Sequence, residues 1–172
     1  GSSWPADESV ILPWINQSTK KVLIAPHQVD DKHVEQIISG ISRKVARYSF
    51  LKESSIMDFD VLILDTIGQL ASAYKYGTLA YVGGGFSGCL HNILEPAVFG
   101  LPVILGPKHT RFPEAQAFID GGFGFSIETT TQFEKAFETI LTDLKSIGDK
   151  ERSFVEASAG ASERIYQAVF VS

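Results

Sequence analysis

A glycine-rich turn followed by three polar residues is the part of the chain best suited to hold a ligand. Four glycines stand within six residues, directly after a short apolar run: Gly83, Gly84, Gly85 and Gly88. Glycine lets the backbone turn tightly and bring its N–H groups against a bound phosphate. His91, Asn92 and Glu95 follow at positions i, i+1 and i+4, so they gather at the tip of a helix that we expect to begin near Asn92. The pattern predicts half of a site for a nucleotide sugar.

The glycines also have two simpler interpretations. Residues 83–88, GGGFSG, formally match the G-x-G-x-x-G dinucleotide motif. They lie in the middle of the chain, however, and residues 106–108, Gly-Pro-Lys, stand where that motif needs an acidic ribose partner, so NAD binding is disfavoured. A turn that needs only positive φ angles explains one or two glycines but not four. We expect Gly84 or Gly85 to approach the phosphate so closely that an added Cβ would strike the ligand.

Each of the three polar residues has a structural and a functional interpretation. Glu95 can complement a helix dipole, a surface effect of about 0.3–1 kcal/mol, or its two carboxylate oxygens can accept both hydroxyls of a ribose. Asn92 can cap the helix or donate to the same ligand. His91 can donate to a phosphate or to a sugar carboxylate. His91 and Glu95 have no third partner that completes a metal site, so we expect no metal here.

Further candidate residues follow the ends of other expected strands. His27 comes after a strand at 21–25 and can reach an anionic ligand, whereas Asp30 and Asp31 are expected to cap the next helix. A strand at 61–64 leads into a turn whose residues can cap a helix or contact a ligand: Asp65, Thr66, Ile67 and Gly68. A small positive patch, which can neutralise a phosphate or form a solvated loop, consists of Lys108, His109 and Arg111.

Strands and helices alternate along the chain. Apolar runs predict strands at 21–25, 61–64 and 79–82, in the run that ends at Pro107, and at 123–127. Helical spacing and capping residues predict helices at 33–48, 67–76, from about residue 92, and at 113–120, 131–146 and 150–170. This order implies an α/β fold, a Rossmann-like parallel sheet with helices on both faces. Ligands of such sheets bind at the carboxyl ends of the strands, where the candidate residues fall.

Composition limits the chain to one domain of an ordinary globular kind. Its 172 residues, 44% hydrophobic and 20% charged, suffice for a core but not for two Rossmann-like halves. A net charge of −5 argues against nucleic acid as a partner. Cys89 is the single cysteine, so no internal disulfide can form. No apolar run approaches the roughly 20 residues of a membrane span, and no signal peptide opens the chain, so we expect this piece to be soluble.

The first 18 residues differ in character from the remainder. Gly1-Ser2 resembles the remnant of an expression tag, and residues 4–18 contain two prolines without sustained periodicity. We therefore expect residues 1–18 to be a tag remnant and an interdomain linker. Residues 19–172 are expected to form the ligand-binding domain.

Two stretches of the chain resemble a known family. LILDTIGQLASAYKYGTLAYVGGG, residues 62–85, is similar to the family pattern LLDT-x-GEL…Y…AD-x-AFVGGS, and HNILEPAVFGLPVILGP, residues 91–107, to HN-x-LEPA-x-FG-x-PV followed by GP. The order and spacing match the C-terminal domain of 3-deoxy-D-manno-octulosonic acid (Kdo) transferases, which build the inner core of lipopolysaccharide. Residues 87–90 depart from it, since the family more often has a Gly-Gly pair before HN, and residues 110–112 stand where it has Asn-Phe.

The resemblance implies the donor-binding half of a GT-B glycosyltransferase. CMP-Kdo would be the donor substrate, with no further cofactor. Glu95, just before a proline, would hold the ribose, and the turn at Asp65 would lie against the base, with Ile67 on the cytosine ring. His91 and His27 would stabilise the leaving CMP. The catalytic base would lie in an N-terminal half outside this chain, so this fragment would bind the donor without turnover.

The resemblance also implies a setting for the longer protein. The acceptor would be a lipid A precursor. The N-terminal half would bind this acceptor and associate with the membrane, at the cytoplasmic face of the bacterial inner membrane. Two alternatives share the glycine turn and the ribose carboxylate. One is another GT-B glycosyltransferase or an epimerase that uses a UDP-sugar, and the other is a noncatalytic nucleotide-binding domain.

Overall fold

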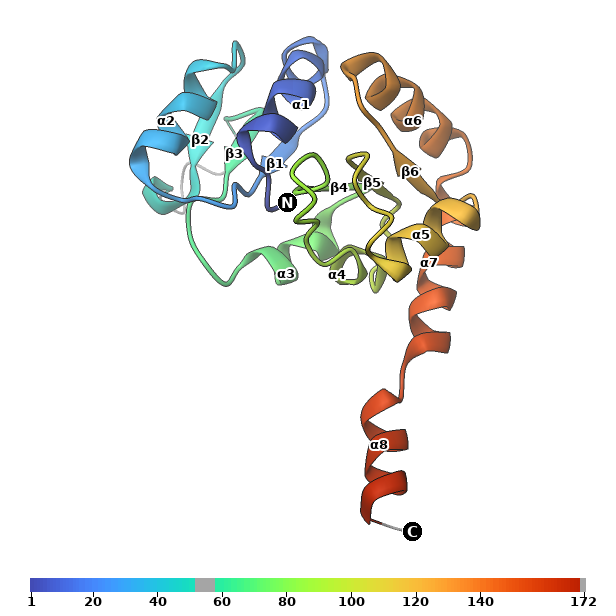
Figure 1. Ribbon diagram of the computed structural model, residues 1–172. Coiled ribbons are helices and arrows are strands. Elements are labelled where there is room, and N and C mark those ends of the chain that lie inside the picture. Colours follow the sequence, from blue (N-terminus) through green and yellow to red (C-terminus); the bar gives the residue numbers. More distant parts are fainter. Residues whose placement is uncertain (52–57, 171–172) are drawn as a thin grey trace.

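Two three-stranded parallel sheets form the centre of the fold. The structure is a computed structural model that describes residues 1–51 and 58–170 (Figure 1). One sheet has the strand order β1-β3-β2 and the other the order β4-β5-β6, with every described pairing parallel. The strands span Val22–Ile24 (β1), Val45–Arg47 (β2), Val61–Ile63 (β3), Ala80–Val82 (β4), Val103–Leu105 (β5) and Gly124–Ser126 (β6).

Helices occupy the connections between the strands. In Figure 1, α8 extends away from the body of the molecule. No helix among the described residues is long and apolar enough to cross a membrane. The α-helices span Pro5–Gln17 (α1), Asp31–Ser39 (α2), Leu70–Ala73 (α3), Leu94–Ala97 (α4), Pro113–Asp120 (α5), Thr130–Thr142 (α6), Leu144–Ser158 (α7) and Ala161–Phe170 (α8). Short 3-10 turns span Tyr48–Phe50 (η1) and Tyr74–Tyr76 (η3).

Strands β4 and β5 are covered on both faces because their side chains alternate between two cores. Val82 and Leu105 pack with residues of α4 and α5, whereas Tyr81 and Ile104 pack with residues of α6. A strand buried on both faces reads as an uninterrupted apolar run, which is typical of a parallel sheet between helices. The predicted Rossmann-like α/β fold is therefore confirmed.

Residues 1–3 join the two sheets. Ser3 forms a parallel bridge with Pro26, just beyond β1. On the other side, the Gly1 nitrogen donates to the Tyr81 carbonyl at 2.5 Å, and Gly83 N–H donates to the Gly1 carbonyl at 2.9 Å. The strands of both sheets therefore run in the same direction, and their carboxyl ends lie along one edge.

A helix occupies the segment in which the sequence analysis expected an irregular linker, so that expectation is wrong for residues 4–18. Pro5 stands at the first helical position, where a proline starts a helix instead of interrupting it. Val10, Ile11 and Trp14 pack into the core beneath α6, and the Trp14 ring lies 4.9 Å from that of Phe133. The buried side of this helix begins with two acidic residues, Asp7 and Glu8, so the sequence shows no sustained apolar spacing.

The helix expected at 33–48 ends early, and β2 was missed. Helix α2 stops at Ser39 with Gly40 as its C-cap, and the chain then turns into β2. Ile41 and Val45 continue the apolar spacing because they pack against the same core as Val34. The prediction of one helix at 150–170 is also wrong. The chain there belongs to two helices, α7 and α8, which are separated at Gly160, whose φ is +85°. The spacing of apolar residues therefore indicates which residues are buried, but not whether one helix continues through them.

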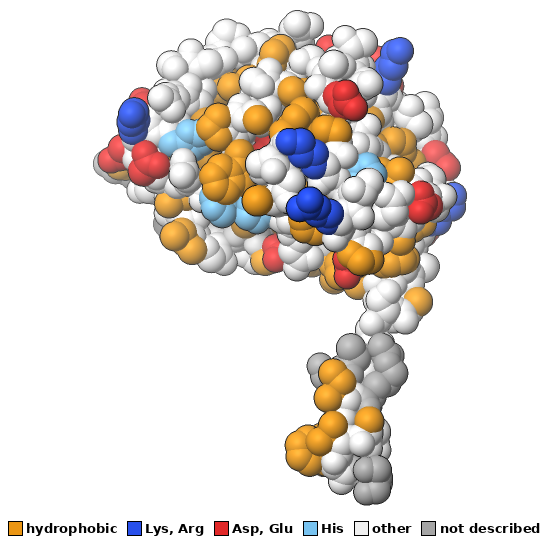
Figure 2. Space-filling model, in the orientation of Figure 1, with side chains coloured by type: hydrophobic (Ala, Val, Ile, Leu, Met, Phe, Trp, Pro, Cys, Tyr) orange, Lys and Arg blue, Asp and Glu red, His pale blue; other side chains and the backbone are white. Residues whose placement is uncertain are grey.

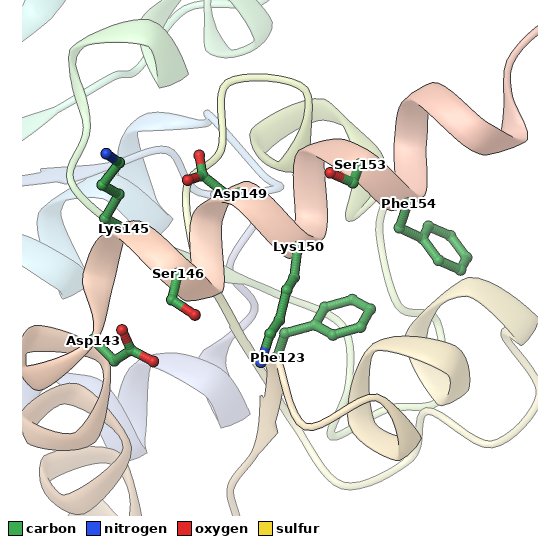
Figure 3. A pocket seen from close by; sticks show the side chains of 8 residues that line it. All are labelled: Phe123, Asp143, Lys145, Ser146, Asp149, Lys150, Ser153 and Phe154. Atoms are coloured by element: carbon green, nitrogen blue, oxygen red, sulfur yellow. The ribbon is translucent and has the colours of Figure 1, made fainter.

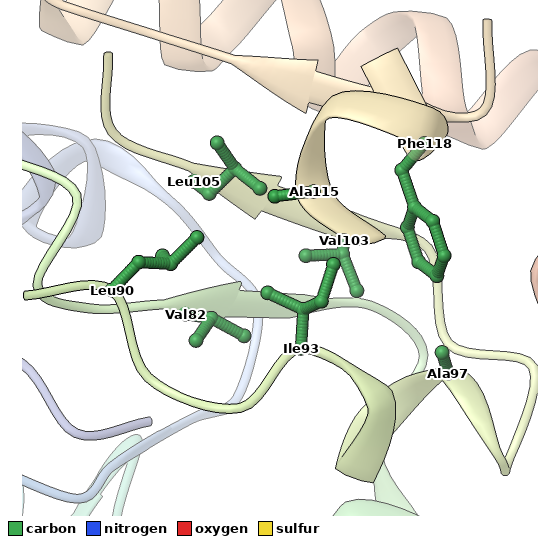
Figure 4. Packing of buried hydrophobic residues seen from close by; sticks show 8 residues of the cluster. All are labelled: Val82, Leu90, Ile93, Ala97, Val103, Leu105, Ala115 and Phe118. Atoms are coloured by element: carbon green, nitrogen blue, oxygen red, sulfur yellow. The ribbon is translucent and has the colours of Figure 1, made fainter. Parts of the chain in front are cut away.

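One core cluster fixes the segment that carries the polar candidates (Figure 4). Leu90 and Ile93 are 8% and 4% exposed, and they hold the chain on either side of His91. They pack against the buried side chains of β4, β5, α4 and α5: Val82, Val103, Leu105, Ala97, Ala115 and Phe118. The backbone at His91 is therefore fixed by apolar packing.

A buried carboxyl group lies at the start of β5. Glu151 of α7 is 0% exposed, and its Oε1 accepts the Val103 N–H at 2.9 Å. Its Oε2 has no hydrogen-bond partner among the described residues. Burial raises the pKa of Glu151 to about 8, against a smaller opposing effect of the Val103 hydrogen bond. The folded protein therefore keeps this carboxyl protonated at neutral pH, whereas the unfolded chain does not.

This pKa difference predicts a loss of stability as the pH rises from about 4.5 to about 8, because only the folded state holds the proton in that window. We expect the free energy of unfolding to fall by on the order of 2–4 kcal/mol between pH 5 and pH 8. Glu151→Gln keeps the acceptor for Val103 and should remove most of this slope, as measured by urea unfolding at several pH values. Glu156→Gln, exposed on the same helix, is the matched control, and an unchanged slope in Glu151→Gln would contradict the account.

Candidate functional site

The candidate residues lie along the edge at which the parallel strands end. His27 follows β1, Asp65 follows β3, Gly83 follows β4 and Lys108 follows β5. Figure 2 shows histidine, hydrophobic, and Lys and Arg side chains sharing one face of the molecule. The edge predicted from the order of strands and helices is thus present in the structure.

The glycine turn is closed by hydrogen bonds to one carbonyl. The Gly84 carbonyl accepts from Gly88 N–H, Cys89 N–H and the Ser87 hydroxyl, each at 3.0 Å. The amides of Gly85, Phe86 and Ser87 have no hydrogen-bond partner among the described residues. Three adjacent free amides resemble the start of a helix, which favours an anion.

Close approach of the protein's own backbone accounts for three of the glycines. A Cβ on Gly83 would lie 2.2 Å from the Ser2 carbonyl oxygen, and one on Gly84 would lie 2.1 Å from that of Cys89. A Cβ on Gly85 would lie 2.5 Å from the Gly106 nitrogen. The protein itself already excludes a Cβ at Gly84 and Gly85, so an alanine there cannot lower ligand binding at little cost in stability. The close approach of a phosphate to these glycines stays a prediction.

Two histidines meet at the edge. The ring centroids of His27 and His91 lie 4.7 Å apart. The backbone N–H of His91 donates to the Gly83 carbonyl at 3.1 Å. Burial, and then the neighbouring His27, lower the pKa of His91 below its ordinary value. His91 is therefore a neutral donor at pH 7, able to offer one ring N–H to an anionic oxygen.

Asp7 and Trp4 belong to the same cluster, and the sequence analysis missed both. The Asp7 carboxylate is 0% exposed and accepts Gly84 N–H at 3.0 Å, Trp4 N–H at 2.9 Å and the Tyr81 hydroxyl at 2.7 Å. Burial and the charge of Asp7 raise the pKa of Tyr81. The available signal was a capping pattern, an acidic residue three positions after the residue that precedes Pro5.

Asn92 and Glu95 contact each other, and Asn92 also lines a small cavity. Asn92 Oδ1 accepts Leu94 N–H at 3.0 Å and its Nδ2 donates to Glu95 Oε1 at 3.4 Å, so its side chain bonds to the first turn of α4. This helix begins two residues later than expected, and its N-cap position is Ile93. Glu95 Oε2 has no hydrogen-bond partner among the described residues. The cavity, of about 160 Å³, is lined by Leu90, His91, Asn92, Ile93, Leu94, Phe112, Glu114 and Ala115.

The turn after β3 is organised differently from the expected cap. Asp65 Oδ2 accepts from Arg47 Nε at 2.8 Å and from the Ser49 hydroxyl at 2.6 Å, and its Oδ1 accepts Ser49 N–H at 2.9 Å. Burial would raise the pKa of Asp65, but the hydrogen bonds from Ser49 and Arg47 outweigh it and hold that pKa low. Asp65 is therefore not a helix cap. Thr66 donates to Gln69 at 2.8 Å, and the side chain next to it, that of Ile67, is 84% exposed.

The remaining candidates have separate places. Asp30 caps α2 by accepting His33 N–H at 3.1 Å, as expected, whereas Asp31 pairs with Arg47 at 2.6 Å. Gly68 has a φ of +98°. His109 is buried, and its Nδ1 has no partner among the described residues. No group of three or more His, Cys, Asp or Glu residues that could hold a metal occurs in the described part of the chain.

A second cavity, larger than the one beside Asn92, lies away from this edge (Figure 3). It is an open groove of about 810 Å³ along α7, lined by Phe123, Asp143, Lys145, Ser146, Asp149, Lys150, Ser153 and Phe154. None of the residues predicted for the site lines it. We place the candidate site at the strand edge because the free amides, the two histidines and Glu95 converge there.

Known proteins are similar to this chain in sequence and in fold. No family model matches the chain. It is 32% identical over 136 residues to the 3-deoxy-D-manno-octulosonic acid transferase of Chlamydophila psittaci, covering 76% of this chain and 31% of that protein. It is 31% identical over 140 residues to the transferase of the same name from Aquifex aeolicus, covering 79% and 38%. The crystal structure of the C-terminal CMP-Kdo binding domain of WaaA from Acinetobacter baumannii superposes with a TM-score of 0.73 at 24% identity, over 90% of this chain and 85% of that chain.

The fold is that of the Rossmann-like C-terminal half of a GT-B protein. The resemblance to the C-terminal domain of Kdo transferases, predicted from two sequence stretches, is confirmed by these relatives. The chain spans about a third of the length of the curated relatives it matches, between 31% and 38% for the first three.

The glycine geometry predicts three graded stability changes. Alanine at Gly84 meets both a positive φ of +90° and the Cys89 carbonyl, and alanine at Gly85 meets the backbone of Gly106. Alanine at Gly88 meets only a positive φ of +83°, because the nearest atom lies 3.8 Å away. We expect Gly88→Ala to cost about 1–2 kcal/mol and the other two to cost more. Equal melting temperatures for the three variants would contradict the close-approach account.

Proposed function

We propose that this domain binds CMP-Kdo and that the longer protein transfers Kdo from it to a lipid A precursor in lipopolysaccharide biosynthesis. The observation that carries the proposal is the similarity to Kdo transferases over more than three quarters of the chain. The match in fold to a CMP-Kdo binding domain supports it. The longer protein would act at the cytoplasmic face of the bacterial inner membrane.

The edge of the sheet offers a partner for each part of the donor. The free amides of the glycine turn face the phosphate, and a neutral His91 donates to the phosphate or to the Kdo carboxylate. Glu95 accepts the ribose hydroxyls, for which its Oε2 is available. The exposed Ile67 provides an apolar surface for the cytosine ring. Asp65 contributes through the placement of this turn, because both of its oxygens are engaged by Arg47 and Ser49.

The chemistry proposed is displacement at the anomeric carbon of Kdo. CMP leaves with negative charge on its phosphate, and preorganised donors lower the free energy of that charge in the transition state. The glycine amides, His91 and His27 supply these donors here. We assign no catalytic base to this chain. The group that activates the acceptor hydroxyl, the acceptor site and the membrane contact belong to the rest of the longer protein.

Calorimetry with this domain should show tighter binding of CMP than of UMP. The isolated domain leaves one side of the cleft open to water, so the affinity is expected to be low but selective. Equal binding of the two nucleotides would favour the alternatives, a UDP-sugar enzyme or a noncatalytic nucleotide-binding domain.

The ribose contact is tested by Glu95→Gln, which keeps the shape and one acceptor oxygen. CMP binding should weaken by on the order of 1–3 kcal/mol, while 2′,3′-dideoxy-CMP should bind the variant and the wild type alike. Glu114→Gln, a carboxylate that lines the small cavity next to His91 and Asn92, is the matched control and should leave both affinities unchanged. Equal losses for both nucleotides in Glu95→Gln would remove Glu95 from the ribose site.

A further inference from the structure

Trp4 contacts both histidines of the candidate site. Its indole Nε1–H donates to His91 Nε2 at 3.3 Å. Its ring stacks on that of His27 with the centroids 4.1 Å apart and the planes at 21°. Trp4 thus makes a polar contact with one histidine and a flat apolar contact with the other.

The backbone of Trp4 is held from several sides. Pro5 restricts the residue before it to extended conformations, and Trp4 has φ −113° and ψ 165°. Trp4 N–H donates to Asp7, and the Trp4 carbonyl accepts Glu8 N–H at 3.0 Å. Because Asp7 also accepts Gly84 N–H, one carboxylate sets the indole and the glycine turn relative to each other.

The hydrogen bond from Trp4 decides which nitrogen of His91 carries the proton. A neutral imidazole has one donor and one acceptor nitrogen. Nε2 accepts from the indole, so Nδ1 must hold the proton and be the donor available to a ligand. The titratable groups that act on His91 are His27, the Gly1 amino group, Asp7 and Glu95, and none of them fixes the tautomer by a hydrogen bond among the described residues.

We propose that Trp4 is a positioning residue of the donor site: its indole N–H fixes His91 in the Nδ1–H tautomer, and its ring holds the plane of His27. The inference rests on the proposed function for the identity of the ligand. It adds a residue from the segment before α1 to a site otherwise built from α4 and the ends of the parallel strands. The donated proton of His91 would then point in a defined direction before the donor arrives.

The test compares Trp4→Phe, which keeps a stacking ring and loses the N–H, with Trp14→Phe. Trp14 is the other tryptophan of the chain, and it packs between Phe133 and Phe137 away from the histidines. Nitrogen-15 NMR of the imidazole ring reports the tautomer and the pKa of His91 without any ligand. Calorimetry with CMP reports the effect on binding separately.

In the wild type and in Trp14→Phe, we expect His91 to carry its proton on Nδ1. In Trp4→Phe, we expect a mixture of tautomers and a higher His91 pKa, because the lost N–H had favoured the neutral ring. The dissociation constant of CMP should rise about two- to tenfold, as for one lost hydrogen bond.

Two results would overturn the proposal. One is a wild-type His91 with its proton on Nε2. This measurement needs only the wild type, so it can be made even if Trp4→Phe fails to fold. The other is a Trp4→Phe variant whose tautomer or CMP affinity equals that of the wild type. Absence of CMP binding in the wild type would instead refute the proposed function, and the ligand-free spectra would still show whether Trp4 orients His91.

Discussion

The buried carboxylate of Asp7 is the interaction on which the candidate site depends. It receives three donors from parts of the chain far apart in sequence: the start of α1, the side chain of Tyr81 in β4 and the backbone of Gly84. Removal of this carboxylate would leave those donors buried and unpaired, which costs about 1–3 kcal/mol for each. The same group thereby fixes the start of a helix, a strand and a glycine turn in one geometry.

The glycines serve this geometry by allowing backbone segments to touch. Residues 1–3 pass between the two sheets, and the contact between Ser2 and Gly83 leaves no room for a Cβ. Gly85 lies equally close to Gly106 at the end of β5. The close packing of strand ends holds the amides of the turn in place, so a ligand meets donors that are already oriented. Such preorganisation is what electrostatic stabilisation of a leaving phosphate requires.

Local features of the site could be predicted from the sequence. The glycine turn, the polar residues after it and α5 with Pro113 at its first position are set by residues within a few positions of one another. The parallel order of the sheet followed from alternation of strands and helices. The resemblance to Kdo transferases added a ligand, which no local pattern specifies.

Contacts between distant segments could not be predicted in the same way. Trp4 and Asp7 stood in a segment interpreted as a linker, and their partners His91 and Gly84 are more than 70 residues away. Asp65 looked like a helix cap until β2, hidden within an expected helix, brought Arg47 beside it. The requirement for glycine at positions 83 and 85 could not be predicted for the same reason. It arises from contact with Ser2 and Gly106, and no residue near the turn indicates that contact.

The central claim is that the nucleotide binds at the strand edge and not in the larger groove beside α7. Mapping of backbone amide chemical shifts during a CMP titration tests it most directly. The account predicts the largest changes at Gly85, Phe86, Ser87, His91 and Ile67. Changes concentrated at Lys145, Asp149 and Phe154, with the glycine turn unaffected, would contradict it.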